Sequence, residues 1–378
     1  MSLFSEVPLA APDPILGTAV AFKADTNPKK INLGIGAYRT DDGRPYVFQA
    51  VRTAEAGILQ EVLDKEYLPI DGLPELKQLT QNVLFGTNCP AIKEGRIASS
   101  QSLSGTGALR LVGDFIKHFL PACLTIREYP YWNSVRTVDT RELFKGAIRD
   151  LHRPQYIQRS VDLSVSQWES ILSVCESRQL LPVLDSAYQG FASGDLSRDA
   201  FSVRLFATKF QGVLFVTQSF AKNLGLYGER VGMLHAICGS PKEAEAVLSQ
   251  IKIVARRCYS SPPLQGARIV ARVLGDEQLR RQWEEELKLV AERIKDMRRL
   301  LRKGLEQKGT PGQWNHITDQ IGMFSYTGLT KEQCELLISK WHIYLLKNGR
   351  ISMAGVNSSN IDYLVNAMDD VIRTIPSV

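Results

Sequence analysis

The feature that most restricts the fold of this chain is the alternation of short apolar runs with longer helical patterns. Residues 180–184 and 212–217 are two such runs, and each is too short for an ordinary helix. Strands that alternate with helices build a buried sheet whose strands are mostly parallel. The sequence therefore predicts an α/β fold, with a mostly parallel central sheet flanked by helices.

A long amphipathic pattern suggests how the chain divides into domains. Apolar residues recur at four- and three-residue steps from about residue 278 to residue 306, which exceeds ordinary helix length. Such a helix is expected to pass from one domain into another, with its basic run 298–303 facing water. We place the boundary near Glu292, so that residues 45–291 form a large domain and residues 292–378 a smaller α/β domain. Residues 1–44 have little helical periodicity and are expected to form an N-terminal arm and part of the small domain.

Composition excludes several classes of protein. The formal charge of +6 is spread along the chain, which argues against a nucleic-acid partner. The six cysteines contain no C-x-x-C pair, which argues against a metal site or a disulfide framework. The first residues lack the features of a signal or transit peptide. No apolar run approaches the roughly 20 residues that span a bilayer. The chain is therefore expected to be cytoplasmic, without a membrane partner.

The strongest local motif is the segment around Lys222, directly after an apolar run that ends at Thr217. Open α/β sheets bind their ligands near the carboxyl ends of strands, and a lysine there can form an imine with an aldehyde. Taken alone, the motif would more often be a surface lysine in a glycine-rich loop. Ser219 and Arg230 favour the functional interpretation, because a hydroxyl and a guanidinium suit a phosphate.

Two further segments fit the same kind of ligand. Asp185 follows an apolar strand, where an ionised carboxylate needs a cationic partner, and Tyr188 lies three residues later. Ser104, Gly105 and Thr106 lead directly into a helical pattern, where free backbone N–H groups can bind an anion. Each segment has a structural alternative, since aspartate caps turns and Ser and Thr cap helices.

Two arginines suggest which kind of substrate the protein binds. Arg350 lies on an expected strand of the small domain, and Arg256 lies just before a Pro-Pro turn. Two guanidiniums would suit a substrate with a carboxylate at each end. In a chain with 46 basic residues, either arginine taken singly is more often a surface residue.

The ordered motifs of this chain resemble those of the aspartate aminotransferase family, which are fold-type-I enzymes dependent on pyridoxal 5′-phosphate (PLP). The similar segments are residues 32–42, 66–70, 185–192, 222–230, 261–268 and 314–324. The resemblance implies a homodimer with shared active sites. It also implies a ping-pong Schiff-base reaction that interconverts L-aspartate and 2-oxoglutarate with oxaloacetate and L-glutamate.

The resemblance also implies a role for each matching residue. Lys222 would carry the cofactor and shuttle the proton, Asp185 would pair the pyridinium nitrogen, and Tyr188 would bond the ring's phenolic oxygen. The phosphate would be held by Ser104, Gly105, Thr106, Ser219 and Arg230, with Tyr67 from the other subunit. The substrate would be held by Gly36 and Arg350 and, from the other subunit, by Arg256. Counting back from the Pro-Pro pair selects Arg256, although Arg257 adjoins it.

The chain departs from the family pattern between about residues 120 and 160. This block is shorter than in the family and lacks its N-P-T-G segment, whose asparagine bonds the cofactor ring. Trp132 is a candidate for the tryptophan that stacks on the ring, but its surroundings equally resemble a later, non-catalytic stretch of the family. The missing asparagine leaves an alternative open, a catalytically impaired relative that binds PLP or only dimerises.

Overall fold

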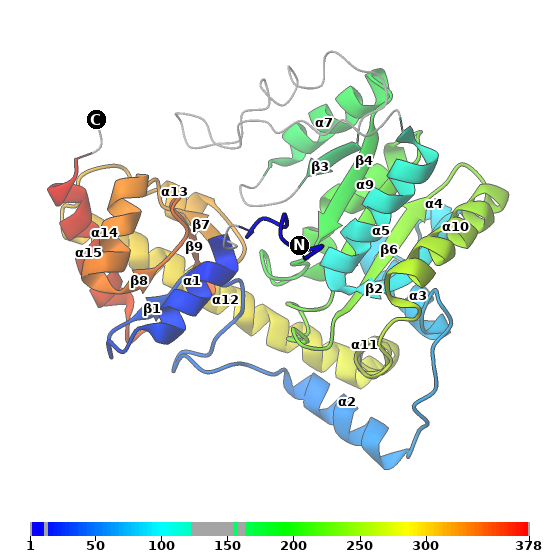
Figure 1. Ribbon diagram of the computed structural model, residues 1–378, viewed down its shortest axis with the longest axis horizontal. Helices are drawn as coiled ribbons and strands as arrows, with labels where there is room; N and C mark the ends of the chain where they lie inside the picture. Colours follow the sequence, from blue (N-terminus) through cyan, green and yellow to red (C-terminus); the bar gives the residue numbers. More distant parts are fainter. Residues whose placement is uncertain (1, 11–13, 122–153, 158–162, 377–378) are drawn as a thin grey trace. The chain divides into compact units, whose positions relative to one another are not determined.

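The computed structural model describes residues 2–10, 14–121, 154–157 and 163–376 (Figure 1). The chain forms two compact units. Unit 1 comprises Met1–Pro45, Asp296–Asp319 and Met323–Val378, and unit 2 comprises Tyr46–Lys295 and Gln320–Gly322. Among the described residues, no helix is both long and apolar enough to cross a membrane.

Unit 2 is built on a sheet of five described strands, which Figure 1 shows side by side. In order across the sheet these are β2 (Ile97–Leu103), β6 (Val231–Ile237), β5 (Leu214–Ser219), β4 (Leu181–Ser186) and β3 (Pro154–Ile157). Strands β3, β4 and β5 are parallel, while β6 runs antiparallel to both of its neighbours. The predicted α/β class is confirmed, and both apolar runs that predicted it form strands.

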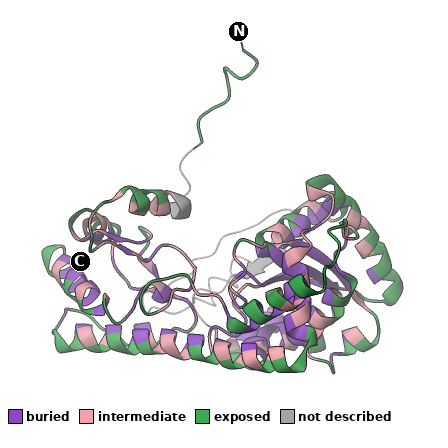
Figure 2. Cartoon of the chain, turned by 90° about the horizontal axis from the view of Figure 1, so that it is seen from below, coloured by how far each residue is buried: buried purple, intermediate pink, exposed green. Residues whose placement is uncertain are grey.

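Helices cover both faces of this sheet, so its strands are buried (Figure 2). One face packs against α5 (Ser104–Phe119) and α10 (Pro241–Tyr259). The other face packs against α3 (Pro74–Phe85), α4 (Pro90–Lys93), α7 (Val165–Ser177) and α9 (Phe201–Lys209). Successive strand residues alternate between these faces, as Val183 and Leu184 do. Asp185, Thr217 and Ser219 therefore belong to the α5 face, at the carboxyl ends of β4 and β5.

The remaining helices of unit 2 include the long helix that the sequence predicts. They are α2 (Gln49–Gln60), α8 (Leu196–Asp199), α11 (Gln265–Gly275) and α12 (Glu277–Gln307). The buried side chains of α12 include Trp283, Leu287 and Val290, which the amphipathic pattern places on one face. The division between the two units falls within this helix, between Lys295 and Asp296.

Unit 1 contains two small sheets and several helices. Strands β1 (Ile31–Asn32) and β8 (Ile343–Tyr344) are parallel, and β7 (Phe324–Tyr326) and β9 (Arg350–Ser352) are antiparallel. The helices are α1 (Pro14–Ala24), α13 (His316–Asp319), α14 (Lys331–Trp341), η2 (Met353–Gly355) and α15 (Ile361–Thr374). Helix α1 forms within the first 44 residues, although their sequence has little helical periodicity. The apolar residues of this helix are spread around its circumference instead of being gathered on one face. Its sequence therefore lacks the polar–apolar contrast that indicates a helical period.

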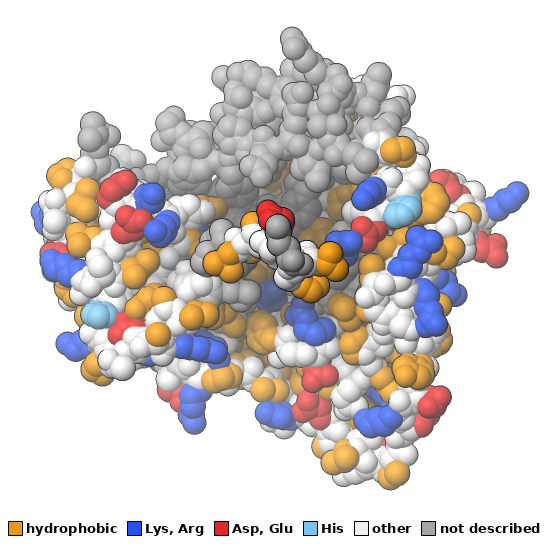
Figure 3. All heavy atoms as spheres, viewed as in Figure 1, with side chains coloured by type: hydrophobic (Ala, Val, Ile, Leu, Met, Phe, Trp, Pro, Cys, Tyr) orange, Lys and Arg blue, Asp and Glu red, His pale blue; other side chains and the backbone are white. Residues whose placement is uncertain are grey.

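The basic run of α12 also differs from expectation. Arg298 is buried rather than facing water, and its guanidinium donates to the backbone oxygens of Ile317, at 2.8 Å, and Phe324. Arg302, four residues on, pairs with Glu306 on the helix surface. Basic and acidic side chains are likewise interspersed on the face shown in Figure 3.

Candidate functional site

Lys222 lies three residues beyond β5, in the loop that leads to β6. Burial lowers the pKa of Lys222, and the positive charge of Arg230 lowers it further, while the carboxylate of Asp185 opposes both effects. The Lys222 Nζ lies 5.3 Å from the centroid of the Tyr188 ring. A lowered pKa leaves more of the amine neutral near pH 7, and the neutral amine is the nucleophile.

Asp185 is held by the neighbouring strand. The parallel register of β4 and β5 pairs Asp185 with Thr217, so the two side chains lie side by side on the α5 face. The Thr217 hydroxyl is fully buried and donates to Asp185 Oδ1 at 2.6 Å. The carboxylate is thereby fixed near the Lys222 amine, whose pKa it raises.

The start of α5 meets the end of β5 through two hydroxyls. Ser104 Oγ and Ser219 Oγ are 2.8 Å apart and both are buried. The Ser104 N–H donates to the Arg230 backbone oxygen at 3.1 Å, which brings the Arg230 segment to the helix start. The first N–H groups of a helix have no partner within it and attract an anion. This turn therefore places two hydroxyls and free backbone N–H groups together beside the Arg230 segment, an arrangement that suits a phosphate.

Two glycines make the close approach of these elements feasible. A Cβ added at Gly105 would lie 3.3 Å from the Ser219 Cβ and 3.7 Å from Asp185 Oδ1. A Cβ added at Gly232 would lie only 2.5 Å from the Ser104 carbonyl carbon and 2.6 Å from the Gln218 oxygen. Any larger residue at Gly232 would push β6 away from both β5 and the start of α5.

The loop that carries Lys222 is hydrogen-bonded to α12. The Trp283 indole is fully buried, and its Nε1 donates to the Asn223 backbone oxygen at 2.6 Å. Asn223 Nδ2 in turn donates to the Gln189 backbone oxygen at 3.3 Å. Asn223 follows Lys222 and Gln189 follows Tyr188, so these bonds tie together the two segments that carry the lysine and the tyrosine.

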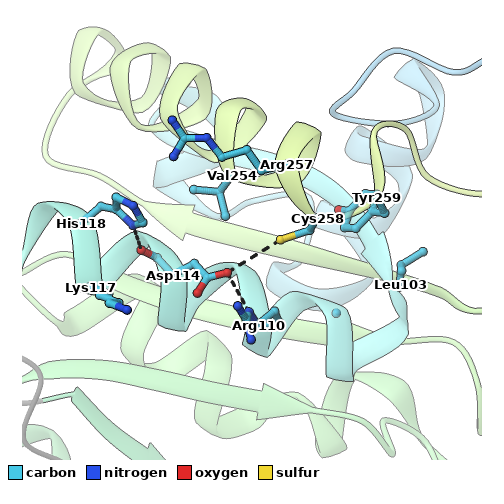
Figure 4. A pocket seen from close by; sticks show the side chains of 10 residues that line it. Leu103, Arg110, Asp114, Lys117, His118, Val254, Arg257, Cys258 and Tyr259 are labelled. Carbon is cyan, nitrogen blue, oxygen red and sulfur yellow. Dashed lines mark hydrogen bonds and ion pairs between the residues drawn. The ribbon is translucent and has the colours of Figure 1, made fainter. Parts of the chain in front are cut away.

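A separate cavity of about 610 Å³ lies between α5 and α10 (Figure 4). Its lining includes Arg110, Asp114, Arg257 and Cys258, but none of the residues that the sequence predicts to bind cofactor or substrate. Asp114 pairs with Arg110 at 2.7 Å. Arg256, in the last turn of α10, instead donates to the Ser260 hydroxyl. The two adjacent arginines thus have different surroundings.

Comparison with known proteins agrees with the geometry. The profile of aminotransferase class I and II matches residues 28–140 and 160–368. The chain belongs to this family. The resemblance found in the sequence is thereby confirmed.

Individual members of the aminotransferase class I and II family are similar over nearly the whole chain. A mitochondrial aspartate aminotransferase of Xenopus tropicalis is 44% identical over 404 aligned positions, covering 98% of this chain and 94% of that protein. The cytoplasmic aspartate aminotransferase structure from Saccharomyces cerevisiae is 37% identical with a TM-score of 0.96, covering 98% of this chain and 99% of that one. An aromatic-amino-acid aminotransferase structure from Burkholderia pseudomallei, covalently bound to pyridoxal phosphate, is 38% identical with a TM-score of 0.94, covering 98% and 100%.

The family profile leaves residues 141–159 unmatched, within the block where the sequence departs from its relatives. The alignment with the Xenopus protein is longer than the 378 residues of this chain, so that relative has residues that this chain lacks. Of the block, the structure describes β3, which pairs in parallel with β4. Trp132 lies outside the described residues.

Four other predicted site residues are distributed between the two units. Tyr67 in unit 2 is 89% exposed, and Thr106 is exposed in the first turn of α5. Gly36 and Arg350 belong to unit 1. There the Arg350 guanidinium lies 4.4 Å from the centroid of the Phe324 ring.

Neither Thr217 nor Trp283 was predicted from the sequence to be a site residue. Thr217 was noted only as the end of a strand, and Trp283 only as part of an amphipathic pattern. No motif marks either one, because their partners lie 32 and 60 residues away in the chain.

Proposed function

We propose that this chain is a PLP-dependent aspartate aminotransferase, which interconverts L-aspartate and 2-oxoglutarate with oxaloacetate and L-glutamate. The observation that carries the proposal is that Lys222, Asp185 and the Ser104–Ser219 pair lie close together at the carboxyl ends of β4 and β5. Family membership supports it, because relatives named aspartate aminotransferase are similar over almost their full length.

The chain's residues fit the cofactor. PLP, when bound, supplies an aldehyde that condenses with amino groups and a pyridine ring that withdraws electrons from the substrate α-carbon. Lys222 would hold it covalently, Asp185 would hold the ring nitrogen protonated, and Tyr188 would bond the phenolic oxygen. Its phosphate would be bound by Ser104, Gly105, Thr106, Ser219 and Arg230. The buried hydroxyl pair and the space that a Cβ at Gly105 would fill support this assignment.

Lys222 would have a second task once substrate has taken its place on the cofactor. Its desolvated amine, with a lowered pKa, would accept the proton from the substrate α-carbon and deliver it to the C4′ carbon of the cofactor. Nearby Arg230 keeps the amine's proton affinity low. Asp185 limits that effect.

The substrate would be held at its two carboxylates. We assign the α-carboxylate to Arg350, with Gly36 beside it, and the side-chain carboxylate to Arg256. A forked guanidinium binds a carboxylate through two parallel hydrogen bonds, which fixes direction as well as charge.

We further propose a homodimer that shares its active sites, with Arg256 and Tyr67 acting in the partner's site. The exposure of both residues in the single chain supports this assignment. We also propose that residues 1–44 and 292–378 act together as the small domain, that Trp132 stacks on the ring, and that the protein is cytoplasmic. Relatives include both cytoplasmic and mitochondrial forms. The alternative left open by the missing asparagine, a catalytically impaired relative, gains no support from the comparisons or from the described residues.

The test compares Arg256→Ala, Arg350→Ala and the neighbouring Arg257→Ala as a control. Arg256→Ala should lower kcat/KM for aspartate by about 100-fold or more, the loss expected when one partner of a desolvated ion pair is removed. Its slow reaction with alanine, which has no side-chain carboxylate, should remain. Arg350→Ala should impair both substrates, and Arg257→Ala neither. If Arg256→Ala reduces activity toward aspartate and alanine equally, Arg256 does not select the dicarboxylate.

A mixed dimer tests the shared site. Combining an Arg256→Ala subunit with a Lys222→Ala subunit places both lesions in one site and leaves the other intact. Hybrids of verified composition should therefore regain up to half of the wild-type activity. Hybrids that stay inactive would place Arg256 in the site of its own subunit.

A further inference from the structure

Thr217 is the buried neighbour of the carboxylate that we assign to the cofactor ring. Its side chain is fully buried, so its hydroxyl must find a partner within the protein. The partner is Asp185 Oδ1 at 2.6 Å. An ionised carboxylate only accepts hydrogen bonds, so the hydroxyl is the donor.

The position of this hydrogen bond follows from the sheet. Asp185 and Thr217 are directly paired in the parallel register of β4 and β5, and Ser219 follows two residues later on the same face. The carboxylate oxygen therefore lies in a fixed place relative to the Ser104–Ser219 pair. Threonine is branched at Cβ and has few accessible rotamers, so its hydroxyl is a stiff donor.

The electrostatic consequence concerns where a shared proton resides. A hydrogen bond donated to a carboxylate stabilises the ionised form over the neutral acid. When a carboxylate faces a pyridine nitrogen, stabilising the carboxylate leaves the proton on the nitrogen. Loss of the Thr217 hydroxyl would therefore favour transfer of that proton to Asp185, which neutralises the pair.

We propose that Thr217 is a positioning residue that orients the Asp185 carboxylate and keeps it ionised, so that it selects a protonated ring nitrogen in the cofactor. This inference rests on the proposed function, which assigns Asp185 to that nitrogen. Thr217 itself does not contact the cofactor in this proposal. It acts only through Asp185.

The test uses two cofactors that differ at the ring nitrogen. One is PLP, and the other is its deaza analogue, in which a C–H group replaces that nitrogen. Equilibrium binding of each to the apoprotein gives an affinity ratio. Effects on Lys222, on the phosphate site or on general stability change both affinities together, whereas an effect on the ring nitrogen changes the ratio.

The variants isolate the hydroxyl. Thr217→Val replaces it with a methyl group of similar size, and Thr217→Ser retains it. Thr217→Ala serves in the same way as Thr217→Val if valine prevents folding. Thr80→Val is the matched control, because Thr80 is also fully buried but donates to the Leu76 backbone oxygen of its own helix, at 2.7 Å.

The wild type should bind PLP more tightly than the deaza analogue. Thr217→Val should reduce that preference by about tenfold, as expected for a hydrogen bond to a charged group, with little change in affinity for the analogue. Thr217→Ser and Thr80→Val should keep the wild-type preference.

Three results would overturn the inference. If Thr217→Val and Thr217→Ala keep the wild-type preference, or weaken both cofactors equally, Thr217 has only a structural role, and the function proposed for Asp185 stands. If the wild type itself shows no preference for PLP, the assignment of Asp185 to the ring nitrogen is wrong, and the role of Thr217 fails with it.

Discussion

A buried histidine should make this protein sensitive to mild acid. His235 lies on β6, on the sheet face opposite Asp185, and is fully buried. Its Nδ1 lies 2.8 Å from the Ser99 hydroxyl and its Nε2 lies 3.2 Å from Gln218 Oε1. Gln81 Nε2 donates to the same Ser99 hydroxyl at 2.7 Å. Neutral imidazole suits these partners, with Nδ1 accepting and Nε2–H donating. Burial lowers the pKa of His235 from 6.5 to about 3.

The direction and size of the effect follow from proton linkage. Above pH 6.5, the pKa of this histidine in the unfolded chain, the imidazole is neutral in both the folded and the unfolded state. Its contribution to the free energy of unfolding is then fully present. As the pH falls from 6.5 toward about 3, the unfolded state binds a proton that the folded state does not, and the free energy of unfolding decreases. At about 1.4 kcal/mol per pH unit, the loss between pH 7 and pH 5 is about 2 kcal/mol.

His235→Gln tests this linkage, because an amide can also accept from Ser99 and donate to Gln218 but does not titrate. The wild-type apoprotein should lose about 2 kcal/mol more than the variant between pH 7 and pH 5 in urea unfolding. Proton uptake on unfolding at pH 5, measured directly in weak buffer, should be about one proton greater for the wild type. His118→Gln, which removes an exposed histidine, should keep the wild-type pH dependence. Equal pH dependence and equal proton uptake in the wild type and His235→Gln would refute the reasoning.

Two other substitutions test the site more locally. When PLP is added to the apoprotein and the product is reduced with borohydride, Lys222 should be labelled, and a label on another lysine would contradict the assignment. Arg230→Gln should shift the pH midpoint of this labelling upward, because Arg230 helps to lower the pKa of the free lysine. Gly232→Ala should destabilise the protein by about 1–3 kcal/mol or more and weaken PLP binding, because the added Cβ meets backbone atoms. Gly228→Ala, where a Cβ would meet nothing within 4 Å, is the control, and equal stability of the two variants would sink the packing argument.

Some features of the protein could be predicted from local sequence. The runs that form β4 and β5 are short, apolar and bounded by polar residues, so burial alone selects strands for them. The apolar period of α12 likewise predicts one long helix, since its spacing matches 3.6 residues per turn. The segment around Lys222 indicated a ligand-binding loop because residue types suited to a phosphate occur within a few positions of it. In each case the information lies within one stretch of chain.

The tertiary structure decided what depends on contacts between distant segments. Arg298 can be buried because the backbone oxygens of Ile317 and Phe324 accept hydrogen bonds from its guanidinium. The helical pattern alone predicts, wrongly, that Arg298 is exposed. The bond between Thr217 and Asp185 exists only because β4 and β5 are adjacent and in register. Helix α1 could not be predicted from a helical period, because its apolar residues are not gathered on one face. A sequence pattern reports the preference of a segment for water or for a core, whereas the pairing of strands across a sheet determines which polar groups meet.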